Sequence, residues 1–210
     1  MQTASALLSR RPHTPAPFVS LGDADITLTL GRVHELCGSA RRTLALALAA
    51  QVGAPVIWIT TPKSSETLNP DGMSALISPK DVLFVRADRE SSLLWAMEEA
   101  LRAGCAPVVI GDLGAAPAMT PVRRLHLAAE TGCGMGQCRP LALLLTPDNG
   151  GAPGIETRWS LQPAHTADGD QWRLERLRAR MAPPRTWLLE YRDSGLAPSH
   201  PPNSAAASAV

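Results

Sequence analysis

The sequence predicts an α/β fold, with a mostly parallel sheet covered by helices and antiparallel strands added at its carboxyl-terminal end. Three observations predict this class. Five short apolar runs alternate with segments of helical length, and parallel strands need such crossovers. The runs are continuously apolar, as strands covered on both faces are. Beyond Gly150 the pattern changes to an alternation of apolar and polar residues, which is typical of antiparallel strands.

The apolar runs are the predicted parallel strands. They cover residues 33–37, 55–60, 81–85, 107–112 and 140–145. A helix is predicted over residues 41–52, where Leu44 and Leu48 lie on one stripe. The pattern of this region therefore predicts a repeated strand–helix unit.

Capping residues set the expected limits of the two later helices. One is predicted to begin at a cap formed by Ser91 or Ser92 and to stop at Gly104. The next is predicted to have Thr120 as its cap, with proline at the first helical position, and to end at Gly132. Both helices would cover the sheet.

The carboxyl-terminal strands are predicted from alternating residues. Trp159 and Leu161 share one side of the first strand, and Trp187 and Leu189 share one side of the last. Between them, residues 172–180 fit both a strand and a helix, and the strand is favoured. We expect these strands to be antiparallel additions at the sheet edge.

Length and composition indicate one domain. The chain has 210 residues, is 45% hydrophobic and carries a formal net charge of +1. We expect a flexible arm over 1–22, a domain over 23–193 and a disordered tail over 194–210, which has no acidic or basic residue. Four cysteines are too few for a disulfide scaffold, and no run approaches the roughly 20 apolar residues of a membrane span. We therefore expect a cytoplasmic protein without membrane contact.

Arginine dominates the basic residues. Only Lys63 and Lys80 are lysines among 20 basic residues. Arginine makes bidentate contacts to carboxylates and phosphates, which favours a protein or nucleic-acid surface. A GC-rich genome would produce the same bias, and this explanation remains open.

A degenerate phosphate loop lies between the first strand and the first helix. A working loop has glycine, four residues and then Gly-Lys-Ser/Thr, so that backbone amides surround the phosphates. Here the distance from Gly38 to Thr43 is two residues short, and Arg42 replaces the lysine. We expect Ser39, Arg41 and the other residues of this loop to bind no nucleotide cofactor. Arg41 and Arg42 oppose the helix dipole by up to about 1 kcal/mol each, so they are expected to be solvated or to meet an anion.

Asp112 ends the fourth strand, where a phosphate-loop ATPase places its magnesium-binding carboxylate. Without a competent loop it has no metal–nucleotide complex to hold. A structural role in a turn or cap is therefore favoured for Asp112. Cys133 and Cys138 lack the spacing of a zinc site, so no metal is expected. No catalytic residue is assigned.

The segment 172–192 combines arginines with large aromatic residues. Such residues are common interface anchors, and together they also suit single-stranded nucleic acid. A hairpin with a solvated outer face is the alternative, and partner binding is favoured over direct DNA binding. The candidate binding residues are Trp172, Arg173, Arg176, Arg178, Arg180, Arg185 and Trp187.

Several blocks of the sequence resemble the ImuA family, distant relatives of RecA. These blocks are GRVHEL at 31–36, LWAMEEALR at 94–102, RRLHLAAE at 123–130, TRW at 157–159, WRLE at 172–175 and RTWLLE at 185–190. The resemblance covers roughly residues 31–191. It implies a RecA-like, P-loop-type core for the domain over 23–193 and a part in damage-induced (SOS) error-prone translesion synthesis.

The resemblance also implies partners. The first is an ImuB-type, Y-family polymerase-like protein, and RecA and an error-prone DnaE-type polymerase are further candidates. DNA would be reached through these proteins, although direct contact stays open. Two other functions remain: a DNA-dependent RecA-like ATPase, which the short loop argues against, and a cell-division inhibitor of the SulA type.

Overall fold

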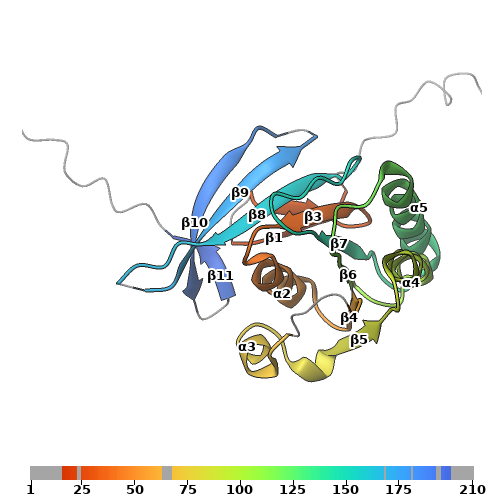
Figure 1. Ribbon diagram of the computed structural model, residues 1–210, viewed down its shortest axis with the longest axis horizontal. Coiled ribbons are helices and arrows are strands. Elements are labelled where there is room, and N and C mark those ends of the chain that lie inside the picture. The colour runs from red at the N-terminus through yellow and green to blue at the C-terminus, as the bar shows by residue number, and fades with distance from the viewer. Residues whose placement is uncertain are drawn as a thin grey trace, which may run out of the picture.

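The computed structural model describes residues 16–22, 25–62, 68–167, 169–180, 182–192 and 195–199. They form a nine-stranded sheet in the order β11-β10-β9-β8-β3-β7-β6-β4-β5 and a two-stranded sheet beside it (Figure 1). The strands are β1 (Phe18–Ser20) and β2 (Thr27–Thr29) of the small sheet, then β3 (Val33–Cys37), β4 (Val56–Thr60), β5 (Val82–Arg86), β6 (Val108–Asp112), β7 (Leu141–Leu145), β8 (Thr157–Pro163), β9 (Gln171–Ala179), β10 (Arg185–Arg192) and β11 (Gly195–Pro198). The helices are α2 (Arg41–Val52), α3 (Pro70–Ser74), α4 (Glu90–Ala103) and α5 (Met119–Met135), with a 3-10 turn at Pro79–Asp81.

The predicted parallel strands are confirmed. Strands β3, β7, β6, β4 and β5 pair in parallel, and each begins within one residue of its predicted start. Pro55, Pro107 and Pro140 were expected inside strands but each lies just before one. Proline has no amide N–H to donate to the ladder, so it is tolerated at a strand's entrance better than within it.

The first carboxyl-terminal strand runs in the opposite sense to the prediction. Strand β8 pairs in parallel with β3, with Leu36 opposite Trp159, and antiparallel with β9, and β10 and β11 continue the antiparallel pairing. The prediction was wrong for β8 because alternation reports that one face of a strand is covered, and this does not fix strand direction. The strand favoured over 172–180 is confirmed as β9.

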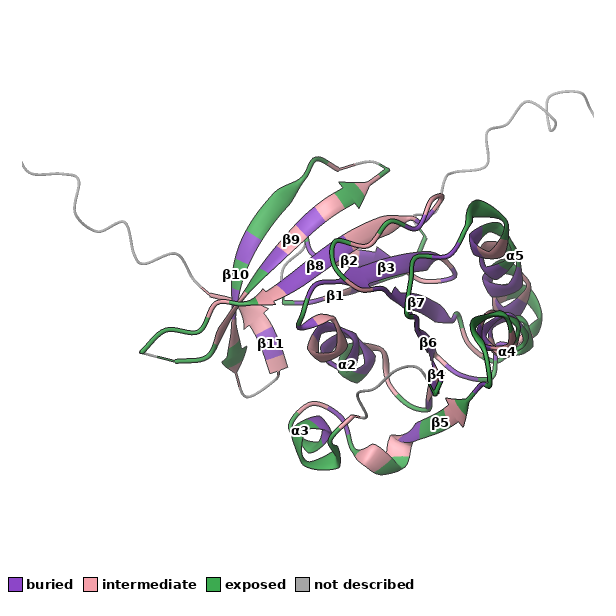
Figure 2. Ribbon diagram, in the orientation of Figure 1, coloured by how far each residue is buried: buried purple, intermediate pink, exposed green. Residues whose placement is uncertain are grey.

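Helices cover the two faces of the parallel sheet separately. One apolar cluster joins α2, α3 and the small sheet to one face and includes the fully buried Trp58. The other joins α4 and α5 to the opposite face and includes Met97. Figure 2 shows that the central strands are buried along their length, whereas the edge strand β5 is largely exposed. The carboxyl-terminal strands β8 to β11 extend the sheet from β3, at the end opposite to β5 (Figure 1).

Both predicted N-caps of the later helices are wrong, whereas the predicted end of the first of them at Gly104 is confirmed. Helix α4 begins at Glu90 without a side-chain cap, and Ser92 hydrogen-bonds Asp88 instead. Helix α5 begins at Met119 and continues past Gly132. A Cβ at Gly132 would lie 2.1 Å from the Leu101 carbonyl oxygen, so this glycine serves the close packing of α5 against α4 and does not end the helix.

The expected arm and tail both contain ordered pairing. Strand β1 lies in the arm predicted over 1–22, and β11 lies in the tail predicted over 194–210. Val19 and Leu196 are buried, so backbone pairing and two apolar contacts order segments whose composition favours disorder. Residues 1–15 and 200–210 of these segments lie outside the described residues. No helix in the described part of the chain is long and apolar enough to cross a membrane.

Candidate functional site

The segment Gly38 to Thr43, which the sequence analysis interpreted as a degenerate phosphate loop, joins β3 to the first turn of α2. Its amides are bonded to the chain itself. The Gly38 amide donates to the Asp148 carbonyl oxygen at 2.9 Å, and the Ala40 amide donates to the Leu161 carbonyl oxygen at 3.1 Å. These are groups that would face phosphate oxygens in a nucleotide site.

Strand β8 fills the remaining space at the loop. The Ser39 amide and hydroxyl both donate to Oε1 of Gln162, at 3.2 and 2.7 Å. Gly38 has a φ of +86°, and a Cβ there would lie 2.4 Å from the Leu161 carbonyl oxygen. Glycine is therefore required at this position for the approach of β8. Thr43 is half-buried in the first turn of α2.

An ion pair occupies the centre of this site. Nε of Arg42, in the first turn of α2, donates to Oδ2 of Asp112 at 2.7 Å, and the two side chains are only 18% and 4% exposed. The structure thus places Asp112 in an ion pair, and not in the turn or cap that the sequence favoured. The expectation of solvated arginines is wrong for Arg42, because the acid that offsets the helix dipole belongs to the same chain.

Arg41 is also turned inward. One of its terminal nitrogens donates to the Gly38 carbonyl oxygen at 3.2 Å. Its Nε is buried and has no acceptor among the described residues. Helix α2 has no acidic residue in its first turn, so Asp112 supplies the negative charge at this helix start.

A buried glutamate, which the sequence reasoning missed, stabilises the neighbouring loop. Glu35 is fully buried and accepts hydrogen bonds from the Thr146 hydroxyl at 2.7 Å and from the Gly151 and Ala152 amides at 2.8 and 3.0 Å. Arg158 forms an ion pair with it at 2.5 Å. The available signal was an acid inside a strand covered on both faces, which must have partners. These bonds fix the loop that presents Asp148 to Gly38.

His34 is fully buried in β3, and both of its ring nitrogens have hydrogen-bond partners. Its ring nitrogens contact the Thr157 hydroxyl at 2.7 Å and the Thr29 carbonyl oxygen at 2.9 Å. Burial lowers the pKa of His34 to about 4, so the ring is neutral at pH 7. Burial, followed by the nearby Glu35 carboxylate, raises the pKa of the Cys37 thiol to about 11. These groups support the strand and are not poised for proton transfer.

The aromatic residues of the candidate binding segment point into the protein. Trp187 is 7% exposed and lies 5.7 Å from Trp159, centroid to centroid. The guanidinium of Arg176 lies 5.2 Å from the Trp187 ring and 5.6 Å from the Trp159 ring, and this side chain is also buried. Trp172 is half-buried and meets His165 edge-on. The expectation that Arg176 and Trp187 share an exposed surface is wrong, because alternation turns both toward the core.

The other arginines of the segment are exposed but separated. Arg173 pairs with Glu175 on its own strand, and Arg185 pairs with Asp25 while lying 5.1 Å from the Trp187 ring. Arg178 and Arg180 lie at the other end of β9, and both are exposed. The exposed arginines therefore lie apart from the buried Trp187, and Tyr191 is the exposed aromatic residue of the segment.

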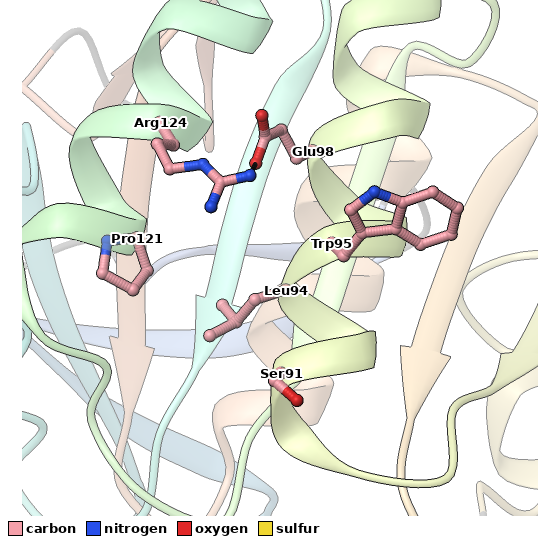
Figure 3. A pocket seen from close by; sticks show the side chains of 6 residues that line it. All are labelled: Ser91, Leu94, Trp95, Glu98, Pro121 and Arg124. Carbon is pink, nitrogen blue, oxygen red and sulfur yellow. Dashed lines mark ion pairs between the residues drawn. The ribbon is translucent and has the colours of Figure 1, made fainter.

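Two surface cavities lie along α5. The cavity between α4 and α5 has a volume of about 180 Å³ and is shown in Figure 3. Leu94 points toward Pro121 there, and the Trp95 ring, 60% exposed, points away from α5. Arg124 pairs with Glu98 across it at 2.6 Å. The charges at this cavity are thus neutralised within the protein.

The second cavity, about 400 Å³, lies on the other side of α5. It is lined by residues of α5, of the loop before β8 and of the end of β9, and by Arg32 at the start of β3. Of the predicted site residues it contains Arg180 alone. It adds Arg123 and Arg32, which the sequence reasoning did not select. Helical spacing from Arg123 to Leu127 was the available signal.

Comparison with known proteins finds similarity to the same family that the sequence blocks resemble. No family model matches the chain. The chain is similar to the protein ImuA of two Caulobacter vibrioides strains, with 26% identity over 225 aligned positions in each case. The alignment covers 90% of this chain and 89% of each relative. The resemblance inferred from the sequence blocks is confirmed as a similarity to ImuA that extends over nine-tenths of the chain.

Proposed function

We propose that this chain is a non-catalytic, RecA-like accessory protein of damage-induced error-prone translesion DNA synthesis. It acts by binding an ImuB-type, Y-family polymerase-like protein, with RecA and an error-prone DnaE-type polymerase as further partners. The observation that carries the non-catalytic part is the self-bonded phosphate loop. Its amides bond to Asp148, Leu161 and Gln162, and Arg42 neutralises Asp112.

The physical argument concerns competition for the same groups. A nucleotide phosphate would need the loop amides, and a magnesium ion would need the Asp112 carboxylate. Each is already engaged by a protein group at hydrogen-bond distance, and the loop is too short to open around a triphosphate while β8 stays in place. Binding a nucleotide would cost the energy of those contacts. The RecA-like assignment rests on the position of this loop and of Asp112 at the carboxyl ends of β3 and β6, together with the resemblance to ImuA.

The partner assignment rests on the relationship to ImuA and on the exposed arginines near the end of β9. It is tested by isothermal titration calorimetry of the full chain with the ImuB-type protein encoded in the same genome. A saturable complex with 1:1 stoichiometry is the expected result. No heat of binding at protein concentrations of about 100 µM, which corresponds to a Kd weaker than a specific complex needs, contradicts the proposal.

The alternative functions have their own readouts. The wild-type chain is expected to show no magnesium–ATP binding and no DNA-stimulated ATP turnover. Turnover that is lost on Thr43→Ala, in a variant that stays folded by circular dichroism, would establish an ATPase. Cell filamentation on overexpression, with unchanged damage-induced mutagenesis in a deletion strain, would favour the SulA-type function instead.

A further inference from the structure

The 400 Å³ cavity beside α5 has one helical wall and one wall formed by loops. Met119, Arg123 and Leu127 follow each other at one-turn spacing along α5 and line the helical wall. Glu156, before β8, and Arg180, after β9, line the opposite wall. We call this surface the α5 groove. It is made from segments far apart in the sequence, so only the folded chain presents it.

Charge in the α5 groove is incompletely neutralised. Glu130 pairs with Arg32, and Glu156 pairs with Arg180 at 3.6 Å. No carboxylate in the described part of the chain is within ion-pair distance of Arg123, which is exposed. The groove therefore carries three guanidinium groups and two carboxylates. The α5 groove also differs from the cavity between α4 and α5, where Arg124 forms an ion pair with Glu98.

The nearby histidine adds no charge. Nε2 of His126 lies 3.1 Å from the Gly154 carbonyl oxygen, and burial lowers the pKa of His126. The ring is thus neutral at pH 7. The excess positive charge of the groove belongs to arginine alone and does not depend on pH near neutrality.

Apolar side chains stand beside the unpaired charge. Leu127 is 63% exposed and Met119 is 38% exposed, on the same wall as Arg123. Methionine adapts to the shape of an apolar partner, and arginine is a common interface anchor. Together these residues match a ligand that combines a carboxylate with an apolar side chain.

We propose that the α5 groove binds a segment of a protein partner that carries carboxylates next to a large aliphatic or aromatic side chain. The carboxylate meets Arg123, and the apolar side chain covers Leu127 and Met119. This inference rests on the proposed function as a partner-binding protein and names the surface that performs it. It also replaces the segment 172–192 as the centre of binding, since only Arg180 of the predicted set reaches the groove.

A protein segment fits the groove better than nucleic acid does. Glu130 and Glu156 line it, and a phosphate backbone would be repelled by both carboxylates. No tryptophan, tyrosine or phenylalanine belongs to the lining, and the ring of His126 is half-buried, so unpaired bases would have little to stack on. A peptide can instead place its carboxylate at Arg123 and avoid the two glutamates.

The test uses the full chain and the ImuB-type protein in calorimetry. Arg123→Glu and Leu127→Ser are the groove variants, and Arg86→Glu is the matched charge reversal on the exposed edge strand β5, at the far end of the sheet. Each groove variant should raise the Kd at least about tenfold, which corresponds to about 1.4 kcal/mol, because a like charge or a lost anchor weakens an interface. Arg86→Glu should leave the Kd unchanged. Raised salt should weaken wild-type binding more than that of Arg123→Ala.

The outcomes separate the inference from the proposed function. If the wild-type chain does not bind the ImuB-type protein, the proposed function fails. If it binds and both groove variants bind as tightly as Arg86→Glu, the proposed function stands and the groove is wrong. Loss of oligothymidylate binding in Arg123→Glu, with protein binding intact, would make the groove a nucleic-acid site. A wild-type dimer in sedimentation that Arg123→Glu dissociates would assign it to a second copy of the chain, and either result overturns the proposal.

Discussion

The start of α2 and the exposed side of α5 both carry arginines, yet the two regions engage them differently. At α2, Arg42 is 18% exposed and bonds Asp112, while the loop amides are satisfied by β7–β8 residues. On α5, Arg123 is exposed beside Leu127 and meets no carboxylate of the described residues. Burial thus decides whether an arginine side chain stabilises the fold, as Arg42 does, or remains available to a partner, as Arg123 does.

Replacing the buried Arg42 should lower the free energy of unfolding more than any other substitution proposed here. Arg42→Ala leaves the Asp112 carboxylate buried without its partner, and we expect the free energy of unfolding to fall by roughly 3 kcal/mol or more. Urea denaturation monitored by circular dichroism measures this. The double variant Arg42→Met, Asp112→Leu should recover most of the loss, because it removes both charges. A loss below about 0.5 kcal/mol for Arg42→Ala would show that the pair is effectively solvated.

The stability of the buried region should also depend on pH. The pKa of His34 is about 4 in the folded protein and 6.5 in the unfolded chain. The unfolded state therefore takes up a proton first, so stability is full above pH 6.5 and falls as the pH drops toward 4, by up to about 3 kcal/mol. The lowered pKa of His126 acts in the same direction.

His34→Asn isolates this contribution. Unfolding free energies measured between pH 7.5 and pH 4 should decline less steeply in the variant than in the wild type, whatever the absolute cost of the substitution. Parallel profiles for the two proteins would mean that His34 does not control the decline. The comparison uses differences between pH values, so a general loss of stability does not obscure it.

Two arginines of β9 repeat the contrast within a single strand. Arg176 is buried between two tryptophan rings and donates to the Pro183 and Asp25 carbonyl oxygens, whereas Arg178 is exposed. Arg176→Leu should lower the unfolding free energy by about 2 kcal/mol, because ring contacts and hydrogen bonds are both lost. Arg178→Leu is the control and should change it by less than about 0.5 kcal/mol. Equal effects measured by thermal or urea unfolding would contradict the burial of Arg176.

The smallest effect is expected on α5. Arg123→Ala removes an exposed side chain without an ion-pair partner among the described residues, so the free energy of unfolding should stay within about 0.5 kcal/mol of the wild type. The same denaturation assay checks this. A destabilisation of more than about 1 kcal/mol would mean that Arg123 stabilises the fold, and it would weaken its assignment to partner binding.

The α/β class, the positions of the five central strands and the place of the segment Gly38 to Thr43 between a strand and a helix could all be predicted from the sequence. These follow from short-range patterns: continuous apolar runs, helical spacing, and the glycine and arginine residues between Gly38 and Thr43. The relationship to ImuA also came from local blocks of sequence. Each of these signals lies within a few neighbouring residues, so no knowledge of the fold was needed to detect it.

The contacts that these residues make depend on the tertiary structure. It brought Asp112 to Arg42 and Gln162 to Ser39, and it set β8 parallel to β3. It also turned Arg176 inward and joined Arg123 to Arg180 in one groove. The reason is that side-chain burial and ion pairing depend on contacts between segments far apart in the chain, and residue type or local alternation does not specify them.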